Sequence, residues 1–135
     1  IFGLTRNTSI AEIVKATIDS IAYQTFDLVK AMEKDSKIKI KEIRVDGGMI
    51  SNNNLNQSIA NILGVKILKP KNTETTALGV AYLAALSSGH LKNLQSIKKI
   101  WKIEKIFVSN SNKKEVLNNL LDWKKAVKIL ISFYK

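Results

Sequence analysis

The sequence has little of several residue types, and each shortage excludes a kind of chemistry. Its 135 residues include no cysteine, one proline and one histidine. The lack of cysteine excludes disulfide bonds, thiolate metal sites and cysteine nucleophiles. Because His90 is the only histidine, the sequence offers no metal-ligand cluster of the usual His and Cys spacing. Its apolar runs fall short of the roughly 18 residues that a membrane-spanning helix requires.

The remaining composition is that of an ordinary globular domain. Hydrophobic residues make up 45% of the sequence and charged residues 24%, which excludes a collagenous, low-complexity or largely disordered chain. The length fits one domain that can bury its own hydrophobic core. Residues 1–135 are therefore expected to form a single domain.

The formal net charge of +11 first suggests a nucleic-acid or other anionic partner. The excess is concentrated in residues 92–135, where eleven lysines face three acidic residues, whereas residues 1–91 hold eleven basic and eight acidic residues. Arginine favours planar recognition of bases and phosphates, yet Arg6 and Arg44 are the only arginines. We interpret the charge as a solvated lysine-rich surface and expect no nucleic-acid partner.

Apolar periodicity and capping residues predict an alternation of helices and strands. The predicted elements are a helix over 9–33, a strand over 42–46, a helix over 52–63, a strand over 65–68, a helix over 73–88, an edge strand or extended arm over 100–108 and a helix over 112–134. The predicted helix caps are Ser9 with Glu12 in a capping box, Ser51 or Asn52, Thr73, and the glycines Gly64 and Gly89 at helix ends.

This order predicts an α/β fold with a partly parallel sheet, because strands joined through crossover helices pair in parallel with right-handed connections. The last predicted helix carries an apolar stripe spaced 4, 3, 4, 3 and 4 residues apart, beside a lysine-rich face. That stripe comprises Val116, Leu120, Trp123, Val127, Leu130 and Tyr134. We interpret the helix as an amphipathic buttress of the domain, with a partner-docking helix as the alternative.

The feature of the sequence with the clearest bearing on binding is Gly47-Gly48 between a predicted strand and the helix start at Asn52. Ligands in α/β folds bind beyond the carboxyl ends of strands, where glycines let the backbone approach and helix amides favour polar groups. A tight turn followed by a capped helix explains the same residues equally well. Asp46 suits a turn-holding carboxylate better than a general base, and His90 suits a solvated loop.

Linked motifs add a resemblance to a known family. Ile1-Phe2-Gly3-Leu4, then Glu12-Ile13 and Ala16-Thr17-Ile18-Asp19, resemble the second signature of the FGGY carbohydrate kinases. Arg44-Val45-Asp46-Gly47-Gly48, the pair Asn52-Asn53, Ile62-Leu63-Gly64 and the run from Thr76 to Ala84 follow in the family's order. Within the family, Arg-Val-Asp-Gly-Gly with paired Asn is most similar to the members that phosphorylate glycerol.

The resemblance implies an actin-like, ribonuclease-H-like fold of two domains around a cleft, with residues 1–135 as the C-terminal, nucleotide-side domain. It implies ATP or ADP as cofactor, with Gly48 and Asn52 lining the adenosine site and Gly47 adjacent. The signature normally begins two residues before Ile1, so we expect an N-terminal catalytic domain outside this chain. That domain would carry the phosphate loop, the glycerol contacts, most Mg²⁺ ligands and the catalytic aspartate.

No catalytic or metal-binding residue is therefore expected within the chain, and the 135 residues alone are expected to be inactive. The complete kinase is expected to be cytoplasmic and homo-oligomeric, without a membrane span. The alternative is a non-enzymatic remnant of kinase-like fold, retained as a basic module that binds nucleic acid or protein. The lysine excess after residue 91 motivates this alternative.

Overall fold

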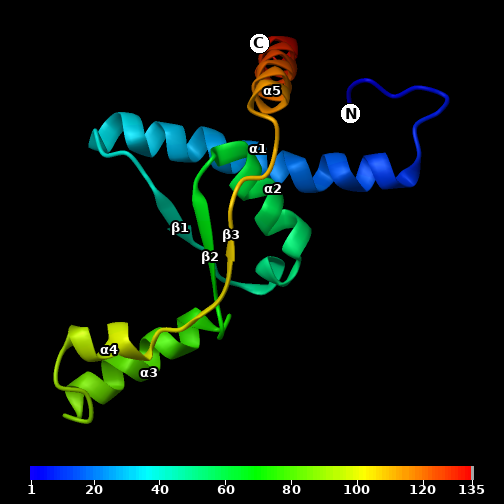
Figure 1. The fold of residues 1–135 in the computed structure, drawn as a ribbon. Helices are drawn as coiled ribbons and strands as arrows, with labels where there is room; N and C mark the ends of the chain where they lie inside the picture. Colours follow the sequence, from blue (N-terminus) through cyan, green and yellow to red (C-terminus); the bar gives the residue numbers. More distant parts are fainter. Residues whose placement is uncertain (135) are drawn as a thin grey trace.

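The computed structural model describes residues 1–134, which form an α/β arrangement around a small sheet (Figure 1). The elements, in chain order, are α1 (Ile10–Ser36), β1 (Glu42–Arg44), the 3-10 helix η1 (Gly48–Ser51), α2 (Asn53–Leu63), β2 (Lys66–Pro70), α3 (Thr75–Ser87), α4 (Leu94–Ile100), β3 (Ile103–Phe107) and α5 (Lys113–Phe133). The predicted α/β fold with a long C-terminal helix is confirmed.

The described sheet has three strands in the order β1-β2-β3. β1 and β2 are parallel, with Glu42 opposite Lys66, as the crossover through α2 requires. β3 runs antiparallel to β2, so the sheet is mixed. The β2–β3 pairing is irregular between Lys69 and Pro70, where the proline has no amide hydrogen to donate.

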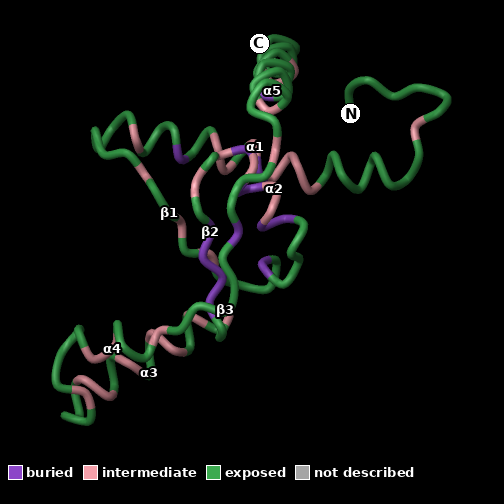
Figure 2. The backbone as a smooth tube through the Cα atoms, viewed as in Figure 1, coloured by how far each residue is buried: buried purple, intermediate pink, exposed green. Residues whose placement is uncertain are grey.

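The core forms where α2 meets the sheet on one side and α1 on the other (Figures 1 and 2). The apolar stripe of α2 is buried there, with Leu55 and Ile59 almost fully covered. Asn52 caps the start of α2, and Gly64 ends it at a φ of 69°, a left-handed conformation that favours glycine. The buried core consists of Ala22, Leu55, Ile59, Ala60, Ile62, Ile67, Phe107 and Leu120.

The start of α1 follows the predicted capping pattern. The backbone amide of Ser9 donates a hydrogen bond to Oε2 of Glu12 at 2.6 Å. That hydrogen bond lowers the pKa of Glu12 below its ordinary value of 4.5.

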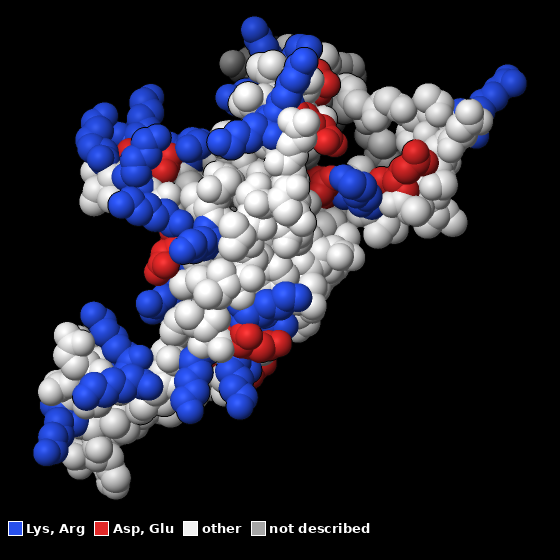
Figure 3. Space-filling view, viewed as in Figure 1, with Lys and Arg blue, Asp and Glu red and all other residues white. Residues whose placement is uncertain are grey.

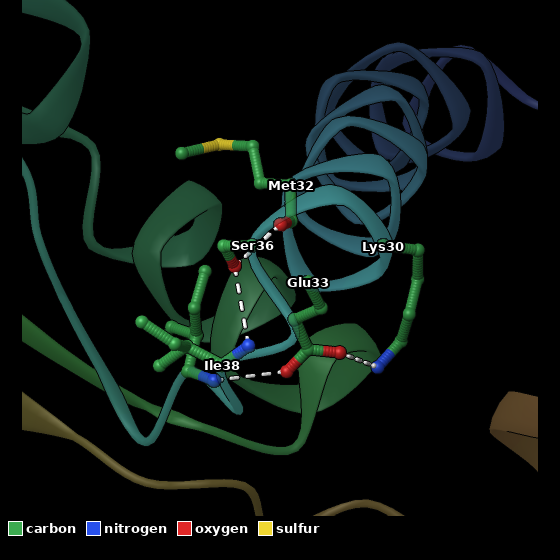
Figure 4. A network of polar contacts seen from close by, with 6 residues as sticks. Lys30, Met32, Glu33, Ser36 and Ile38 are labelled. Atoms are coloured by element: carbon green, nitrogen blue, oxygen red, sulfur yellow. Dashed lines mark hydrogen bonds and ion pairs between the residues drawn. The ribbon is translucent and has the colours of Figure 1, made fainter.

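A network of hydrogen bonds lies at the C-terminal end of α1 (Figure 4). The helix ends at Ser36, three residues beyond its predicted end. The Glu33 carboxylate accepts hydrogen bonds from Nζ of Lys30 at 2.7 Å and from the backbone amide of Ile40 at 2.9 Å. Ser36 donates to the carbonyl of Met32 and accepts from the amide of Ile38. The Lys30 and Ile40 hydrogen bonds lower the pKa of Glu33. These bonds turn the chain from α1 towards β1.

Two sequence predictions at α3 and α4 are wrong. Thr73 does not cap α3, because the cap position is Glu74 and the helix begins at Thr75. The predicted edge strand over 100–108 begins only at Ile103, and Ile100 instead ends α4. Asn93 caps α4 by accepting a hydrogen bond from the amide of Ser96 at 3.1 Å. α3 and α4 form a lobe that extends away from the sheet (Figure 1).

The apolar stripes of the long helices α1 and α5 are covered only in part by the described chain. At the start of α1, Ile10 is 80% exposed, and Val14 is exposed as well. On α5, Leu120 is buried but Leu130 and Tyr134 are exposed. Periodicity identifies an apolar face, but it does not reveal which surface covers that face.

α5 is attached to α1 through its tryptophan. The ring of Trp123 stacks on Tyr23 with 5.4 Å between ring centroids. Its indole Nε1 donates a hydrogen bond to Oδ2 of Asp27 at 2.9 Å. These two contacts give α5 the buttress role predicted for it at this point of the helix.

Candidate functional site

The two loops that follow the parallel strands are joined at the carboxyl edge of the sheet. The backbone amide of Gly47, after β1, donates to the carbonyl of Thr73, after β2, at 3.3 Å. The hydroxyl of Thr75 at the start of α3 donates to Oδ2 of Asp46. Asp46 therefore holds the two loops together, as its turn-holding interpretation predicts. This edge is where α/β folds bind ligands.

Gly47 and Gly48 are glycines for different reasons. Gly47 has φ 84° and ψ 176°, a conformation that side-chain-bearing residues rarely adopt. Gly48 has an ordinary φ, and a Cβ built on it would meet nothing within 4 Å. The described chain therefore does not require glycine at position 48. The missing side chain leaves backbone open to approach from outside.

Asn52 lies at the end of the same turn and has a structural role of its own. Its Oδ1 accepts hydrogen bonds from the amides of Asn54 at 2.9 Å and Leu55 at 3.4 Å. The carbonyl oxygen of the side chain is thus used in capping α2. Within residues 1–134, the Nδ2 group of Asn52 donates no hydrogen bond, so it is the part of the side chain that can contact a ligand.

Sequence reasoning missed Asn56, a buried residue of α2 that is hydrogen-bonded to the backbone of this turn. Its side chain is fully buried, and Nδ2 donates to the carbonyl of Ile50 at 2.7 Å. Oδ1 of Asn56 has no hydrogen-bond partner among the described residues. The signal was present in the sequence, since position 56 falls three residues before Ile59 on the apolar face of α2, where a polar residue is unusual.

The loop after β2 also lines a groove of about 680 Å³. It lies between the first turns of α3 and the segment that joins α4 to β3, and sequence reasoning did not identify it. Its aromatic lining includes Tyr82 and Trp101. The Arg44 guanidinium lies over the Trp101 ring, 4.2 Å from its centre, and this contact connects the end of β1 to the groove.

The remaining sequence candidates do not join this site. His90 is exposed in the loop after Gly89, with Nδ1 2.9 Å from the hydroxyl of Ser88. No three His, Cys, Asp or Glu side chains gather into a possible metal site within residues 1–134. Most of the lysines between residues 92 and 134 lie on α4, β3 and α5, and Figure 3 shows separate basic groups along the outline of the molecule. None of the described helices is long and apolar enough to cross a membrane.

Comparison with known proteins identifies relatives of this chain. Residues 1–88 match the C-terminal domain of the FGGY family of carbohydrate kinases. Glycerol kinase from Paraburkholderia xenovorans is 49% identical over 128 residues, and the glycerol kinase of Burkholderia pseudomallei is 46% identical. Each match covers 95% of this chain but only 26% of the relative, so the chain spans about a quarter of their length.

Solved structures show the same fold. A crystal structure of Plasmodium falciparum glycerol kinase with ADP superposes with a TM-score of 0.84 at 32% identity, over 94% of this chain and 26% of that chain. A xylulose kinase from Lactobacillus acidophilus shares the fold with a TM-score of 0.77 at 24% identity, over 97% of this chain and 26% of that chain. Because the model of the family's C-terminal domain matches residues 1–88, more than half of this chain, the chain belongs to the FGGY family of carbohydrate kinases.

Proposed function

We propose that this chain is the C-terminal, nucleotide-side domain of a glycerol kinase. In the complete kinase, the γ-phosphoryl group of ATP is transferred to glycerol, which gives glycerol 3-phosphate and ADP. The observation that carries the proposal is the 49% identity to a glycerol kinase across 95% of the chain. The likeness to a glycerol kinase crystallised with ADP supports a nucleotide role for this part of the enzyme.

Within this proposal, Gly47, Gly48 and Asn52 form the adenosine side of the ATP site. The open backbone at Gly48 fits a flat ligand, because a side chain there would occupy the space that the ligand needs. Gly47 sets the direction of the turn through its φ of 84°. Nδ2 of Asn52 is a donor suited to the acceptor atoms of a base or ribose.

The chain contributes binding and orientation to the reaction. Phosphoryl transfer depends mainly on positioning and on stabilisation of charge within a closed cleft. ATP supplies the phosphoryl group, and the residues of this chain hold its adenosine end. Within the proposal, Mg²⁺, glycerol and the general base belong to the rest of the kinase, as the family resemblance implies. The isolated chain is accordingly inactive in this proposal.

The same proposal places the enzyme in the cytoplasm, where ATP is available, and leaves its homo-oligomeric state as a prediction.

The site can be tested in a chimera in which this chain replaces the matched segment of the Paraburkholderia xenovorans glycerol kinase. Gly48→Val should raise the KM for ATP about tenfold and leave the KM for glycerol unchanged. Ser51→Val, an exposed change in the same turn, is the control. An unchanged KM for ATP in the Gly48→Val chimera would refute the role of Gly48.

A further inference from the structure

Asn56 places a polar group where the fold favours an apolar one. The residue is fully buried on α2, and Ile59 and Ala60, which follow on the same face of the helix, belong to the hydrophobic core. A buried amide group costs free energy unless hydrogen bonds replace those that it made with water. Packing alone would be served by an apolar side chain such as leucine, so the amide group requires a separate explanation.

The Asn56 amide group has one use within the described chain, a hydrogen bond to the turn that precedes α2. Nδ2 donates to the carbonyl of Ile50 at 2.7 Å, and among residues 1–134 this is the only hydrogen bond that the carbonyl accepts. The other polar atom of the side chain, Oδ1, has no partner among the same residues. Since an unpartnered buried acceptor lowers stability, asparagine is not the residue that would stabilise the core most. Its presence is explained by the hydrogen bond to Ile50.

That hydrogen bond holds the middle of η1. At one end of η1 the Gly47 amide is bonded to the loop after β2, and at the other end Asn52 caps α2. Between these ends, the hydrogen bond from the Ile50 amide to the Gly47 carbonyl is 3.4 Å long, which is longer than an ordinary hydrogen bond. The 2.7 Å bond from Asn56 is shorter, and it joins η1 to a helix of the core.

We propose that Asn56 is a positioning residue for ATP: through Ile50, it fixes η1 in the position in which the backbone at Gly48 contacts the adenosine. The inference rests on the proposed function. Without the Asn56 donor, the Ile50 carbonyl is unsatisfied inside the core, and η1 lowers its free energy by rotating that carbonyl towards water. Gly48 lies two residues away in the same 3-10 turn, so the rotation moves the backbone that contacts the nucleotide.

Leucine at position 56 separates this role from that of an ordinary core residue, because its side chain has the branching of asparagine but no hydrogen-bonding group. In the chimera with the Paraburkholderia xenovorans kinase, Asn56→Leu should raise the KM for ATP about fivefold and change the KM for glycerol and the kcat by less than about twofold. Asn56→Ala, which cannot overpack the core, should raise the KM for ATP as well. An unchanged KM for ATP in both variants would overturn the proposal.

A core substitution away from η1 shows whether a loss of stability alone has this effect. Ile62 is buried near the opposite end of α2. Ile62→Val should lower the midpoint of urea unfolding and leave the KM for ATP unchanged. If Ile62→Val raises the KM for ATP as much as Asn56→Leu does, or if Asn56→Leu raises the KM for ATP and for glycerol by the same factor, Asn56 acts through general stability and the proposal is overturned.

Hydrogen exchange in the full 135-residue chain, measured by mass spectrometry, tests the positioning without any reaction. Asn56→Leu should speed amide exchange in peptides that contain Gly48–Ser51 at least about threefold, while exchange in β2 changes by less than about twofold. Equal exchange of these peptides in the substituted and unsubstituted chains would overturn the proposal. If the unsubstituted chimera does not phosphorylate glycerol, the proposed function fails, whereas the exchange measurement still decides whether Asn56 holds η1 in place.

Discussion

Asn52 is proposed to have two functions, and two substitutions separate them. Its Oδ1 caps α2 through hydrogen bonds from the amides of Asn54 and Leu55, whereas its Nδ2 group is the proposed donor to the nucleotide. Asn52→Asp keeps an oxygen acceptor at the cap and removes the donor. Asn52→Ala removes both groups. If Asn52 only caps α2, Asn52→Asp should leave nucleotide binding unchanged. If Asn52 also binds the nucleotide, both substitutions should weaken nucleotide binding.

The expected magnitudes follow from these contacts. Loss of the cap in Asn52→Ala should destabilise the chain by about 1 kcal/mol. Asn52→Asp should be neutral or slightly stabilising, because a carboxylate at a helix N-terminus interacts favourably with the helix dipole. Both variants lose one hydrogen bond to the nucleotide, worth about 1 kcal/mol, which corresponds to a rise of about fivefold in the KM for ATP.

Two assays measure these effects. Urea unfolding of the full chain, followed by circular dichroism, gives the stability, and steady-state kinetics of the chimera give the KM for ATP and for glycerol. Asn52→Ser, which retains an acceptor for the cap, serves as a stability control. If Asn52→Asp leaves the KM for ATP unchanged, Asn52 is a helix cap and no more. If Asn52→Ala leaves the stability unchanged, the assignment of the cap is wrong.

Three further predictions concern the stability of the chain in urea unfolding. Gly47→Ala should lower the free energy of unfolding by about 1–3 kcal/mol, because the φ and ψ of Gly47 suit glycine alone. Gly48→Ala should change that free energy by less than about 0.5 kcal/mol. Equal losses in the two variants would contradict this prediction. Trp123→Phe should cost about 1 kcal/mol through the lost hydrogen bond to Asp27, and an unchanged midpoint would show that α5 is held by packing alone. Because hydrogen bonds lower the pKa of Glu33 from 4.5, the stability they contribute is present above that value and lost as pH falls through the lowered pKa. Glu33→Gln should therefore unfold with a weaker acid dependence, and an unchanged acid dependence would refute this role.

Local signals in the sequence were sufficient for most of the fold. Asn52 and Gly64 mark the ends of α2 because a side-chain acceptor and a left-handed glycine satisfy backbone groups within one turn. The crossover through α2 then makes β1 and β2 parallel. α4 was missed because a seven-residue helix has too few turns to establish a period, although Asn93 supplied a capping signal.

Features that depend on the surroundings were not predictable. The apolar pattern of α1 includes Ile10, yet Ile10 is 80% exposed. A pattern defines an apolar face, but it does not say which surface covers that face. Thr73 has the residue type of a helix cap, but its carbonyl accepts the Gly47 amide and the helix begins two residues later. The open space beside Gly48 depends on the backbone of the whole turn, including the support from Asn56.

The central claim is that this chain completes a glycerol kinase from the nucleotide side. Its most direct test is ADP release by the purified, folded chimera in which this chain replaces the matched segment of the Paraburkholderia xenovorans enzyme. We predict ADP release that depends on glycerol and yields glycerol 3-phosphate, with none from the isolated chain. A folded chimera that releases no ADP with glycerol, although the unmodified Paraburkholderia enzyme does so in the same assay, would contradict the account.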